Sequence, residues 1–358
     1  MRIAERLLAA LILVCALAAA QATYVNIQDF GAVPNDGNDD SAAIQAAFDS
    51  LDRVQGGTVL CPAGTYDVLT PIVVRGSGVR FIGNAGPSYN EDPPYVGCTL
   101  VARTNGMTLL RFGGGSLDHH GPGIEFVNFR DGTPAGPSAT LLEIYNFNRW
   151  TVRNVTVNYA STGLKVTGLD DASWGYISQL FCKNSITCLD QSTTEGGFLI
   201  TGGGLEPLAT GVRVRGSQVR IVGVKFDCVS GSTGVEVTGH ATDVTASSFE
   251  QCGIGILVRD DGTQRWNGDQ NHLIGNHFNG SDVDGSRGIS LGPGADGNQL
   301  IGNTYEYPDI NVEDNGSNNL RIEQGVGIDK NLSCPQGQAI RALQVRQGIV
   351  TGATCGQI

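Results

Sequence analysis

The sequence has little charge, and positive charge is especially scarce. Only 16% of its 358 residues are charged, and 23 Lys and Arg stand against 35 Asp and Glu, for a formal net charge of −12. Such a chain has no electrostatic footprint for a polyanion such as DNA, so we expect no nucleic-acid partner. The charge disfavours an acidic polysaccharide only mildly, because a local cationic groove or bound calcium can reverse the sign near a site.

Long hydrophobic runs are also scarce, and the longest is at the N-terminus. Arg2 and Arg6 precede a 14-residue apolar run from Leu7 to Ala20, and the small-x-small pattern Ala-Gln-Ala follows. This run is too short for a comfortable membrane span, so we predict a secretory signal peptide over residues 1–22. The mature chain would then be secreted or periplasmic, with no membrane partner.

The sequence has no Cys-x-x-Cys pair, so a zinc site has little support. Of the nine cysteines, eight remain once Cys15 leaves with the signal peptide. An even number in an exported chain favours disulfides. We predict that Cys228 pairs with Cys252, about one repeat apart, and that Cys334 pairs with Cys355 and staples the tail.

The 51 glycines keep no three-residue period, which excludes collagen. The sequence indicates one helix, at residues 41–54. Its apolar positions are spaced by 4, 3 and 3 residues, at Ile44, Phe48, Leu51 and Val54. This spacing places them on one face of a helix, with Asp40 or Ser41 available as the N-cap.

From about residue 120 the chain repeats itself. A turn residue followed by an apolar, a variable and an apolar residue recurs as GLKV at 163, SITC at 185, GVRV at 211, GVEV at 234 and GILV at 255. A second strand-like unit alternates with the first, and no helical stretch lies between them. This pattern predicts a β-solenoid whose coils bury apolar positions against each other, with the helix as a cap on the first coil.

Asparagines recur at matching positions of the later repeats. They are Asn271, Asn276, Asn298, Asn303, Asn318 and Asn319. We predict that they stack as turn amides and satisfy backbone groups at the corners of the coils.

The segment before the repeats resembles the N-terminal signature of the pectate-lyase-like superfamily. The matching elements are Asp29-Phe30-Gly31-Ala32, Asp36-Gly37, Asp39-Asp40, Ala43-Ile44-Gln45-Ala46-Ala47, Gly56-Gly57-Thr58-Val59 and Pro62-Ala63-Gly64-Thr65-Tyr66. The resemblance implies an all-β, right-handed parallel β-helix with an N-terminal capping helix. We assign it to residues 23–325, followed by a tail at 326–358.

The polygalacturonases of this superfamily have a catalytic pattern that the chain does not match. Their Arg-Ile-Lys is missing, since Arg220-Ile221-Val222 lacks the lysine, and Gly239-His240 is followed by alanine. We therefore do not transfer that site to this sequence.

The repeats place a group of charged side chains on one exposed face. Side chains alternate along a strand, so the residues between the apolar positions point outward. The alignment sets Thr187 beside Lys165 and places Asp190 just past its strand. The residues sharing the face would be Lys165, Asp190, Arg213, Arg215 and Glu236, with Asp170 and Asp171 near its edge.

This face suits two chemistries. In β-elimination of a uronate, Lys165, Arg213 or Arg215 would remove the proton beside the carboxylate, while Asp190 and Glu236 would orient the sugar or hold a Ca²⁺ ion. In hydrolysis, two carboxylates among Asp170, Asp171 and Asp190 would flank the glycosidic bond. Alternatively, the charges form cross-coil ion pairs without a catalytic role.

An insertion of about ten residues separates GILV from the next repeat at 288. It contains Trp266, which would either stack on a sugar ring or pack the loop onto its coil, and it follows Arg259, a further candidate for substrate binding. Together with the resemblance, these features favour a polysaccharide-degrading hydrolase or lyase. A non-catalytic carbohydrate-binding or surface protein and a uronan epimerase are the alternatives.

Overall fold

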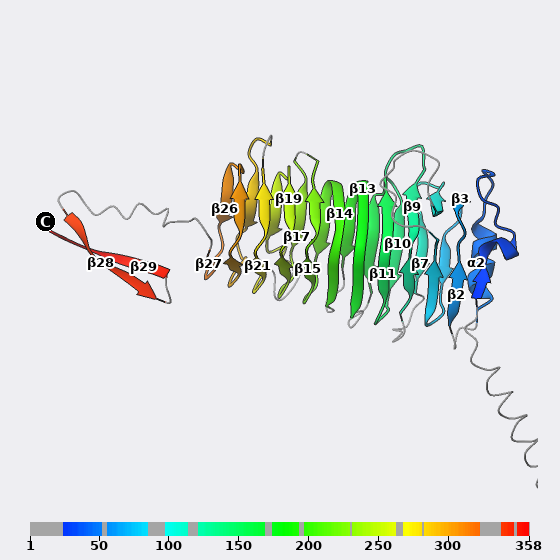
Figure 1. Ribbon diagram of the computed structural model, residues 1–358, viewed down its shortest axis with the longest axis horizontal. Coiled ribbons are helices and arrows are strands. Elements are labelled where there is room, and N and C mark those ends of the chain that lie inside the picture. Colours follow the sequence, from blue (N-terminus) through cyan, green and yellow to red (C-terminus); the bar gives the residue numbers. More distant parts are fainter. Residues whose placement is uncertain are drawn as a thin grey trace, which may run out of the picture.

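The protein is an elongated parallel β-solenoid with a short helix at one end (Figure 1). The computed structural model describes residues 24–51, 56–84, 97–113, 121–168, 174–192, 197–229, 231–262, 268–280, 283–322, 338–346 and 349–357. Their strands form one 27-stranded parallel system and a separate two-stranded antiparallel sheet. The predicted fold class is thereby confirmed. In the part of the chain that the structure describes, no helix has the length and apolarity to cross a membrane.

The coils have three faces, which we call A, B and C in the order in which the chain passes through them. Strands β11 (Thr151–Asn158), β13 (Gly175–Gln191) and β14 (Phe198–Val214) bend from one face to the next. The other strands of face A are β1 (Tyr24–Asn26), β2 (Gly57–Leu60), β5 (Val79–Ile82), β8 (Gly123–Glu125), β15 (Arg220–Val222), β18 (Asp243–Thr245), β21 (His272–Ile274), β24 (Gln299–Ile301) and β27 (Leu320–Ile322).

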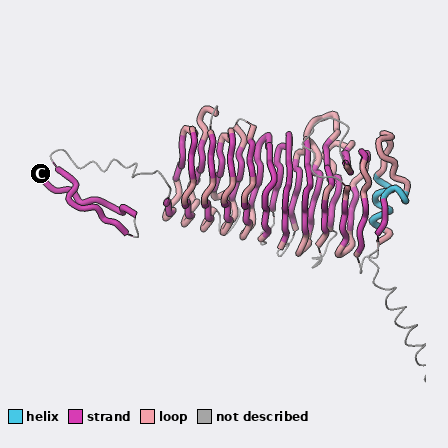
Figure 2. The backbone as a smooth tube through the Cα atoms, in the orientation of Figure 1, coloured by secondary structure: helices cyan, strands magenta, loops and turns pink. Residues whose placement is uncertain are grey.

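Faces B and C are built in the same way. Face B also contains β3 (Gly64–Val68), β6 (Cys98–Ala102), β9 (Val127–Asp131), β16 (Lys225–Asp227), β19 (Ser248–Glu250), β22 (His277–Asn279) and β25 (Thr304–Glu306). Face C also contains β4 (Ile72–Val74), β7 (Thr108–Phe112), β10 (Thr140–Tyr145), β12 (Thr162–Thr167), β17 (Thr233–Val237), β20 (Ile254–Val258), β23 (Arg287–Leu291) and β26 (Ile310–Asp314). The tube in Figure 2 shows the coils in succession, and β28 (Gln338–Arg346) and β29 (Ile349–Gln357) form the separate hairpin.

The predicted capping helix is present as α2, Ser41–Asp49, after the short 3₁₀ turn η1, Ile27–Phe30. Ile44 and Phe48 are buried, and the Phe48 ring lies 5.4 Å from that of Phe81 and 5.9 Å from that of Phe112. Asp40 is at the N-cap but its carboxylate makes no capping bond. It accepts instead from the backbone N–H groups of Val33 and Asp67, which ties the helix start to face B.

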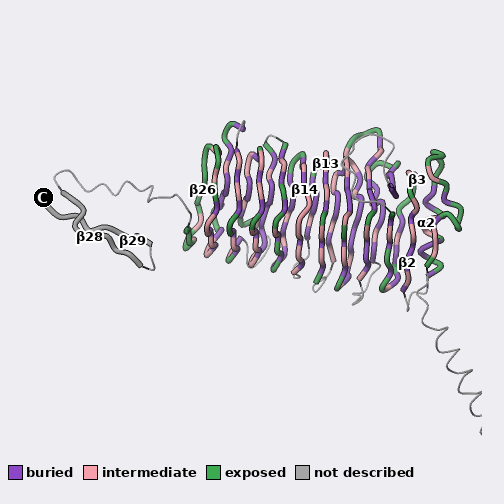
Figure 3. Tube along the Cα trace, viewed as in Figure 1, coloured by how far each residue is buried: buried purple, intermediate pink, exposed green. Residues whose placement is uncertain are grey.

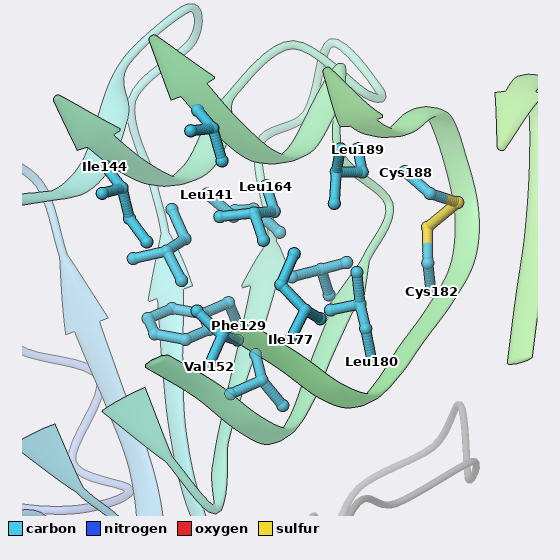
Figure 4. Close-up of a cluster of buried hydrophobic side chains, with 14 of the residues drawn as sticks. Phe129, Leu141, Ile144, Val152, Leu164, Ile177, Leu180, Cys182, Cys188 and Leu189 are labelled. Atoms are coloured by element: carbon cyan, nitrogen blue, oxygen red, sulfur yellow. A yellow bond between two sulfur atoms is a disulfide. The ribbon is translucent and has the colours of Figure 1, made fainter. Parts of the chain in front are cut away.

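The core is continuous along the solenoid, and buried residues recur in every coil (Figure 3). On face C, Leu142, Leu164 and Leu189 are paired in register, and all three are fully buried. Figure 4 shows Leu189 beside the disulfide between Cys182 and Cys188, with Leu164 farther from it, next to Leu141. Each coil therefore buries its apolar positions against its neighbours, as a solenoid requires.

The glycine that begins each later repeat makes room for an aromatic ring. On face B, the rings of Phe226, Phe249, Phe278 and Tyr305 stack at centroid distances of 4.7, 4.8 and 5.2 Å. A Cβ on Gly234 would lie 2.6 Å from Cδ1 of Phe249, and one on Gly255 would lie 2.5 Å from Cδ1 of Phe278. The repeated glycine therefore reflects a contact between face C, which carries the glycine, and face B, which carries the ring.

The predicted asparagine stacks are present at the corners of the coils. Asn298 Oδ1 accepts from the backbone N–H and side-chain amide of Asn271, and Asn319 does the same for Asn298. Asn303 likewise accepts from Asn276. Asn318 is exposed and lies outside these stacks, because its neighbour Asn319 occupies the ladder position.

Three disulfides join described cysteines. The predicted bond between Cys228 and Cys252 is confirmed, and Cys61–Cys98 and Cys182–Cys188 are additional. Some predictions concern parts of the chain outside the described residues. These parts are Cys334, the signal peptide and residues 52–55, which include Val54. The Cys334–Cys355 bond therefore stays a prediction.

The predicted register is wrong at the SITC repeat. Asp190, and not Thr187, pairs with Lys165, while Thr187 pairs with Thr162. Ile186, expected inside, is 40% exposed. The reason is that SITC is not the segment equivalent to GLKV. Thr187, Leu189 and Asp190 pair with Thr162, Leu164 and Lys165, so the two coils are offset by 25 residues, whereas aligning GLKV at 163 with SITC at 185 assumes 22.

Candidate functional site

Six consecutive coils of face C carry a charged residue at the same outward position. The strands involved are β7, β10, β12, β13, β14 and β17, which follow one another along the solenoid (Figure 1). In register, the residues are Arg111, Glu143, Lys165, Asp190, Arg213 and Glu236. Neighbouring rungs of a sheet are about 4.8 Å apart, so positive and negative side chains alternate at contact distance.

Glu143 and Glu236 are each held between two cations. Glu143 lies 3.6 Å from Arg111 Nε and 3.9 Å from Lys165 Nζ. Glu236 has shorter contacts, at 2.7 Å from Arg213 Nε to one carboxylate oxygen and 2.7 Å from Arg259 Nη2 to the other. Arg259 reaches Glu236 from the next coil, two residues after the outward Leu257.

Of the effects on the pKa of Glu236, burial is the largest, and it favours the neutral form of the carboxyl group. The hydrogen bonds from Arg213 and Arg259 and their positive charges outweigh burial, and the pKa of Glu236 is lowered. This carboxylate is therefore ionised at neutral pH and is unsuited to act as a general acid. It is a fixed negative charge that positions two guanidinium groups.

Asp190 lies between these two groups and contacts one cation, without the short hydrogen bonds of Glu236. Its closest ionic contact is 3.5 Å, from Oδ1 to Arg215 Nη2. The same Oδ1 is buried and, among the described residues, makes no hydrogen bond, so the contact has the distance of an ion pair without the geometry of a hydrogen bond. Buried polar atoms are nearly always hydrogen-bonded, and a charged atom left without a partner points to a missing partner such as water, an ion or a ligand.

This ion-paired stretch of face C has more positive than negative charge. Five cations, Arg111, Lys165, Arg213, Arg215 and Arg259, contact three carboxylates. Tyr145 adds an aromatic ring beneath the Arg111 guanidinium, 4.1 Å from the ring centroid. A chain with a formal net charge of −12 thus presents a locally cationic strip, and such a strip attracts anions.

The structure brings together six of the residues that the sequence singles out. Lys165, Asp190, Arg213, Arg215, Glu236 and Arg259 lie on face C and are linked by ion pairs or register. Asp170, Asp171 and Trp266 lie outside the described residues. The carboxylate pairs proposed for hydrolysis therefore have no described geometry.

Sequence reasoning missed Arg111 and Glu143 at the start of the strip. The missed signal is a repeat that begins before residue 120, since Thr108-Leu109-Leu110 and Thr140-Leu141-Leu142 are identical triplets whose first and last residues pair in register. Aligning them would have placed Arg111 opposite Glu143.

The described residues of face C do not indicate a metal centre. Among the described residues, no three His, Cys, Asp or Glu side chains gather as a set that could hold a metal ion. The paired Glu143 and Glu236 already have cationic partners. The Ca²⁺ expected for a lyase therefore stays a prediction.

Comparison with known families gives a match at the N-terminus. Residues 24–109 match the family described as rhamnogalacturonase A/epimerase, pectate lyase-like. This segment contains the cap and the first coils, and it includes Arg103 but ends before Arg111. The match therefore concerns the fold and leaves the strip on face C outside it.

A short similarity to a curated protein is also present. A mannuronan C5-epimerase, AlgE3 of Azotobacter vinelandii, is 54% identical over 43 residues, which is 12% of this chain and 2% of the epimerase. The chain therefore matches a very small part of that protein's length.

Among solved structures, a protein of Geobacillus virus E2, ORF18, has a TM-score of 0.59 at 18% identity. The match covers 83% of this chain and 59% of the viral protein. The enzymatically active domain of tailspike protein 2 from bacteriophage CBA120 has a TM-score of 0.57 at 14% identity. That match covers 80% of this chain and 43% of the tailspike chain. At these identities the likeness concerns the fold alone.

Proposed function

We propose that this chain, whose residues 24–109 match the rhamnogalacturonase A/epimerase, pectate lyase-like family, is an exported protein that acts on an acidic, uronate-containing polysaccharide along face C. The observation that supports this most is Asp190, a carboxylate in register between Lys165 and Arg213 whose buried Oδ1 accepts no hydrogen bond from the described residues. Glu236 accepts short hydrogen bonds from two arginines, whereas Asp190 contacts a single cation and has acceptor capacity left for a ligand.

The chemistry that fits these groups is β-elimination. Arg213 and Arg215 would neutralise the sugar carboxylate, which makes the proton on the adjacent carbon more acidic. Lys165 is the cation that can supply a base, because an arginine guanidinium stays protonated in proteins. The neutral amine takes the proton, the C–O bond to the leaving sugar breaks, a C=C bond forms, and the departing oxygen takes a proton from solvent.

Hydrolysis has weaker support at this strip. It requires one carboxylic acid that is protonated before the reaction. The pKa of Glu236 is lowered because Arg213 and Arg259 outweigh its burial, so it does not meet that requirement. A uronate substrate also accords with the similarity to a protein named for mannuronan, a polymer of a uronic acid.

The export of this protein has two supports. The N-terminal sequence has the pattern of a secretory signal peptide. The three disulfides are typical of an oxidising compartment, where such bonds persist.

A non-catalytic carbohydrate-binding role is the second candidate. It is favoured by the complete ion pairing of Glu143 and Glu236, which is what a structural charge ladder would show. In that case the strip holds an anionic chain without breaking it.

Substitutions separate the two roles. We expect Asp190→Asn and Lys165→Ala to lower turnover of an acidic polysaccharide at least about a hundredfold, the usual contribution of a positioned acid or base, with little change in the thermal melt. Lys225→Ala is the matched control, because Lys225 also joins a carboxylate across coils, at 3.1 Å from Glu250, but on face B. Turnover that survives both face C substitutions would contradict the assignment, and binding without turnover in the wild type would favour the second role.

A further inference from the structure

One corner of the solenoid, between faces C and A, carries a row of residues in the left-handed backbone conformation. Each lies two residues before the residue that pairs in register on face A. Along successive coils the non-glycine members and their φ angles are Arg149 (57°), Trp174 (66°), Gln218 (60°), Ala241 (51°), Gln270 (55°) and Asn318 (57°). The row borders the charged strip, because Gln218 follows Arg215 by three residues.

A tryptophan such as Trp174 is energetically unfavourable at a position of this row. A positive φ is tolerated by Gly and Asn and is an outlier for a bulky side chain, at a cost of about 1–3 kcal/mol. The indole gains nothing from burial in return, since Trp174 is 77% exposed. A costly residue with no packing role is explained if its exposed ring has a ligand.

The backbone beneath Trp174 is fixed by its neighbours. Its N–H donates to the carbonyl oxygen of Gly197 at 2.8 Å. A Cβ on Gly175 would lie 2.1 Å from the buried indole of Trp150, so this position must be glycine, and Trp150 packs 5.3 Å from Phe198. The exposed ring therefore projects from a rigid support.

The residues beside Trp174 on the same corner supply polar groups. Arg149 is one coil before it, is exposed, and makes no ion pair within the part of the chain that the structure describes. The next coil has Gly197 at the same place, with no side chain, and the coil after that has the exposed Gln218. A Cβ on Gly197 would lie 2.6 Å from the carbonyl oxygen of Gln218, so the coils pack closely here, and the exposed indole has a guanidinium on one side and a carboxamide on the other.

We propose that Trp174, Arg149 and Gln218 form a sugar-binding subsite at the edge of the charged strip. A pyranose ring packs its apolar C–H face on the exposed indole, its carboxylate pairs with Arg149, and a hydroxyl bonds to Gln218. This subsite rests on the proposed function in that it takes the same acidic polysaccharide. It would hold part of that chain away from Asp190, across the corner.

The test uses a substitution that removes the ring and relieves the backbone. Trp174→Gly should weaken binding of polygalacturonate or alginate about tenfold, the loss expected for one aromatic contact, while the melting temperature stays unchanged or rises because glycine favours a positive φ. The intrinsic tryptophan emission of the wild type should shift on titration with polygalacturonate, and that shift should be missing in the variant. Arg149→Ala should weaken binding of the acidic chains alone and reduce its salt dependence.

Gln270→Gly is the matched control, because it relieves the same conformation at the same corner farther along the solenoid. It should leave binding unchanged. An unchanged affinity in Trp174→Gly, a fall in its melting temperature, or an emission that no polysaccharide alters would each overturn the subsite. Loss of turnover in Asp190→Asn with an intact emission shift would leave the subsite standing, so its failure and that of the proposed function are distinguishable.

Discussion

Two carboxylates on face C, two coils apart, have opposite surroundings. Glu236 contacts Arg213 and Arg259 at 2.7 Å, whereas the closest cation to Asp190 is at 3.5 Å and its buried oxygen has no hydrogen bond among the described residues. The first arrangement stabilises the coil, and the second leaves capacity for a ligand. The sequence shows both as outward acids and contains no signal that distinguishes them, because the difference depends on the rotamers of the arginines.

The lowered pKa of Glu236 predicts an acid-dependent loss of stability. A carboxylate with a lowered pKa in the folded state contributes stability above its unfolded pKa, about 4.3, and this contribution is lost as pH falls through the folded value. Glu236→Gln should therefore be less stable than the wild type at pH 7, with a difference that shrinks in acid. Denaturant unfolding at several pH values measures this.

The control for that experiment is Glu313→Gln, a more exposed carboxylate in the same row, paired with Arg287 at 2.9 Å. Its effect on stability should be small, since exposed ion pairs contribute little. Equal pH profiles for Glu236→Gln and the wild type would show that the two arginines do not hold this carboxylate as described.

At the scale of one coil, the contact between a repeat glycine and the ring beneath it makes a sharp prediction. Gly234→Ala would set a methyl group 2.6 Å from Phe249 Cδ1 and 2.7 Å from the carbonyl oxygen of Gly255. We expect a loss of about 1–3 kcal/mol in the free energy of unfolding, the usual cost of overpacking. Gly123→Ala, whose nearest atom would be the Thr151 hydroxyl at 3.3 Å, should cost much less. Similar losses at both positions would argue against ring contact as the reason for the repeat glycine.

The elements also show where sequence reasoning succeeds and where it fails. The solenoid, the helix and the Cys228–Cys252 bond follow from periodicity, because each coil repeats the same inward positions. The register at Asp190 does not, since SITC has the apolar spacing of the repeat, whereas the segment Thr187–Asp190 is the one that pairs with Thr162–Lys165. Trp174 was missed because its backbone conformation, and not its neighbours in sequence, makes it unusual.

For the whole molecule, the helix α2 covers one end of the solenoid and separates its apolar core from water. Phe48 is 4% exposed and packs against Phe81 and Phe112 of the first coils. Phe48→Ala should cost about 3 kcal/mol in stability and loosen the cap over the strand edge. Light scattering after size-exclusion chromatography should then detect association that the wild type does not show. A destabilised but strictly monomeric variant would mean that the helix is not needed to protect that edge.

The central claim is that an acidic polysaccharide is processed on face C, and one assay tests it most directly. The purified mature protein is incubated with polygalacturonate, rhamnogalacturonan, alginate and neutral glucans, with and without calcium, while reducing ends and ultraviolet absorbance are followed together. Our account predicts that both signals rise with at least one acidic polymer, that neither rises with neutral glucans, and that Asp190→Asn abolishes the rise. Reducing ends without absorbance would indicate a hydrolase and contradict the proposed elimination, and no change with any polymer would contradict a degrading role altogether.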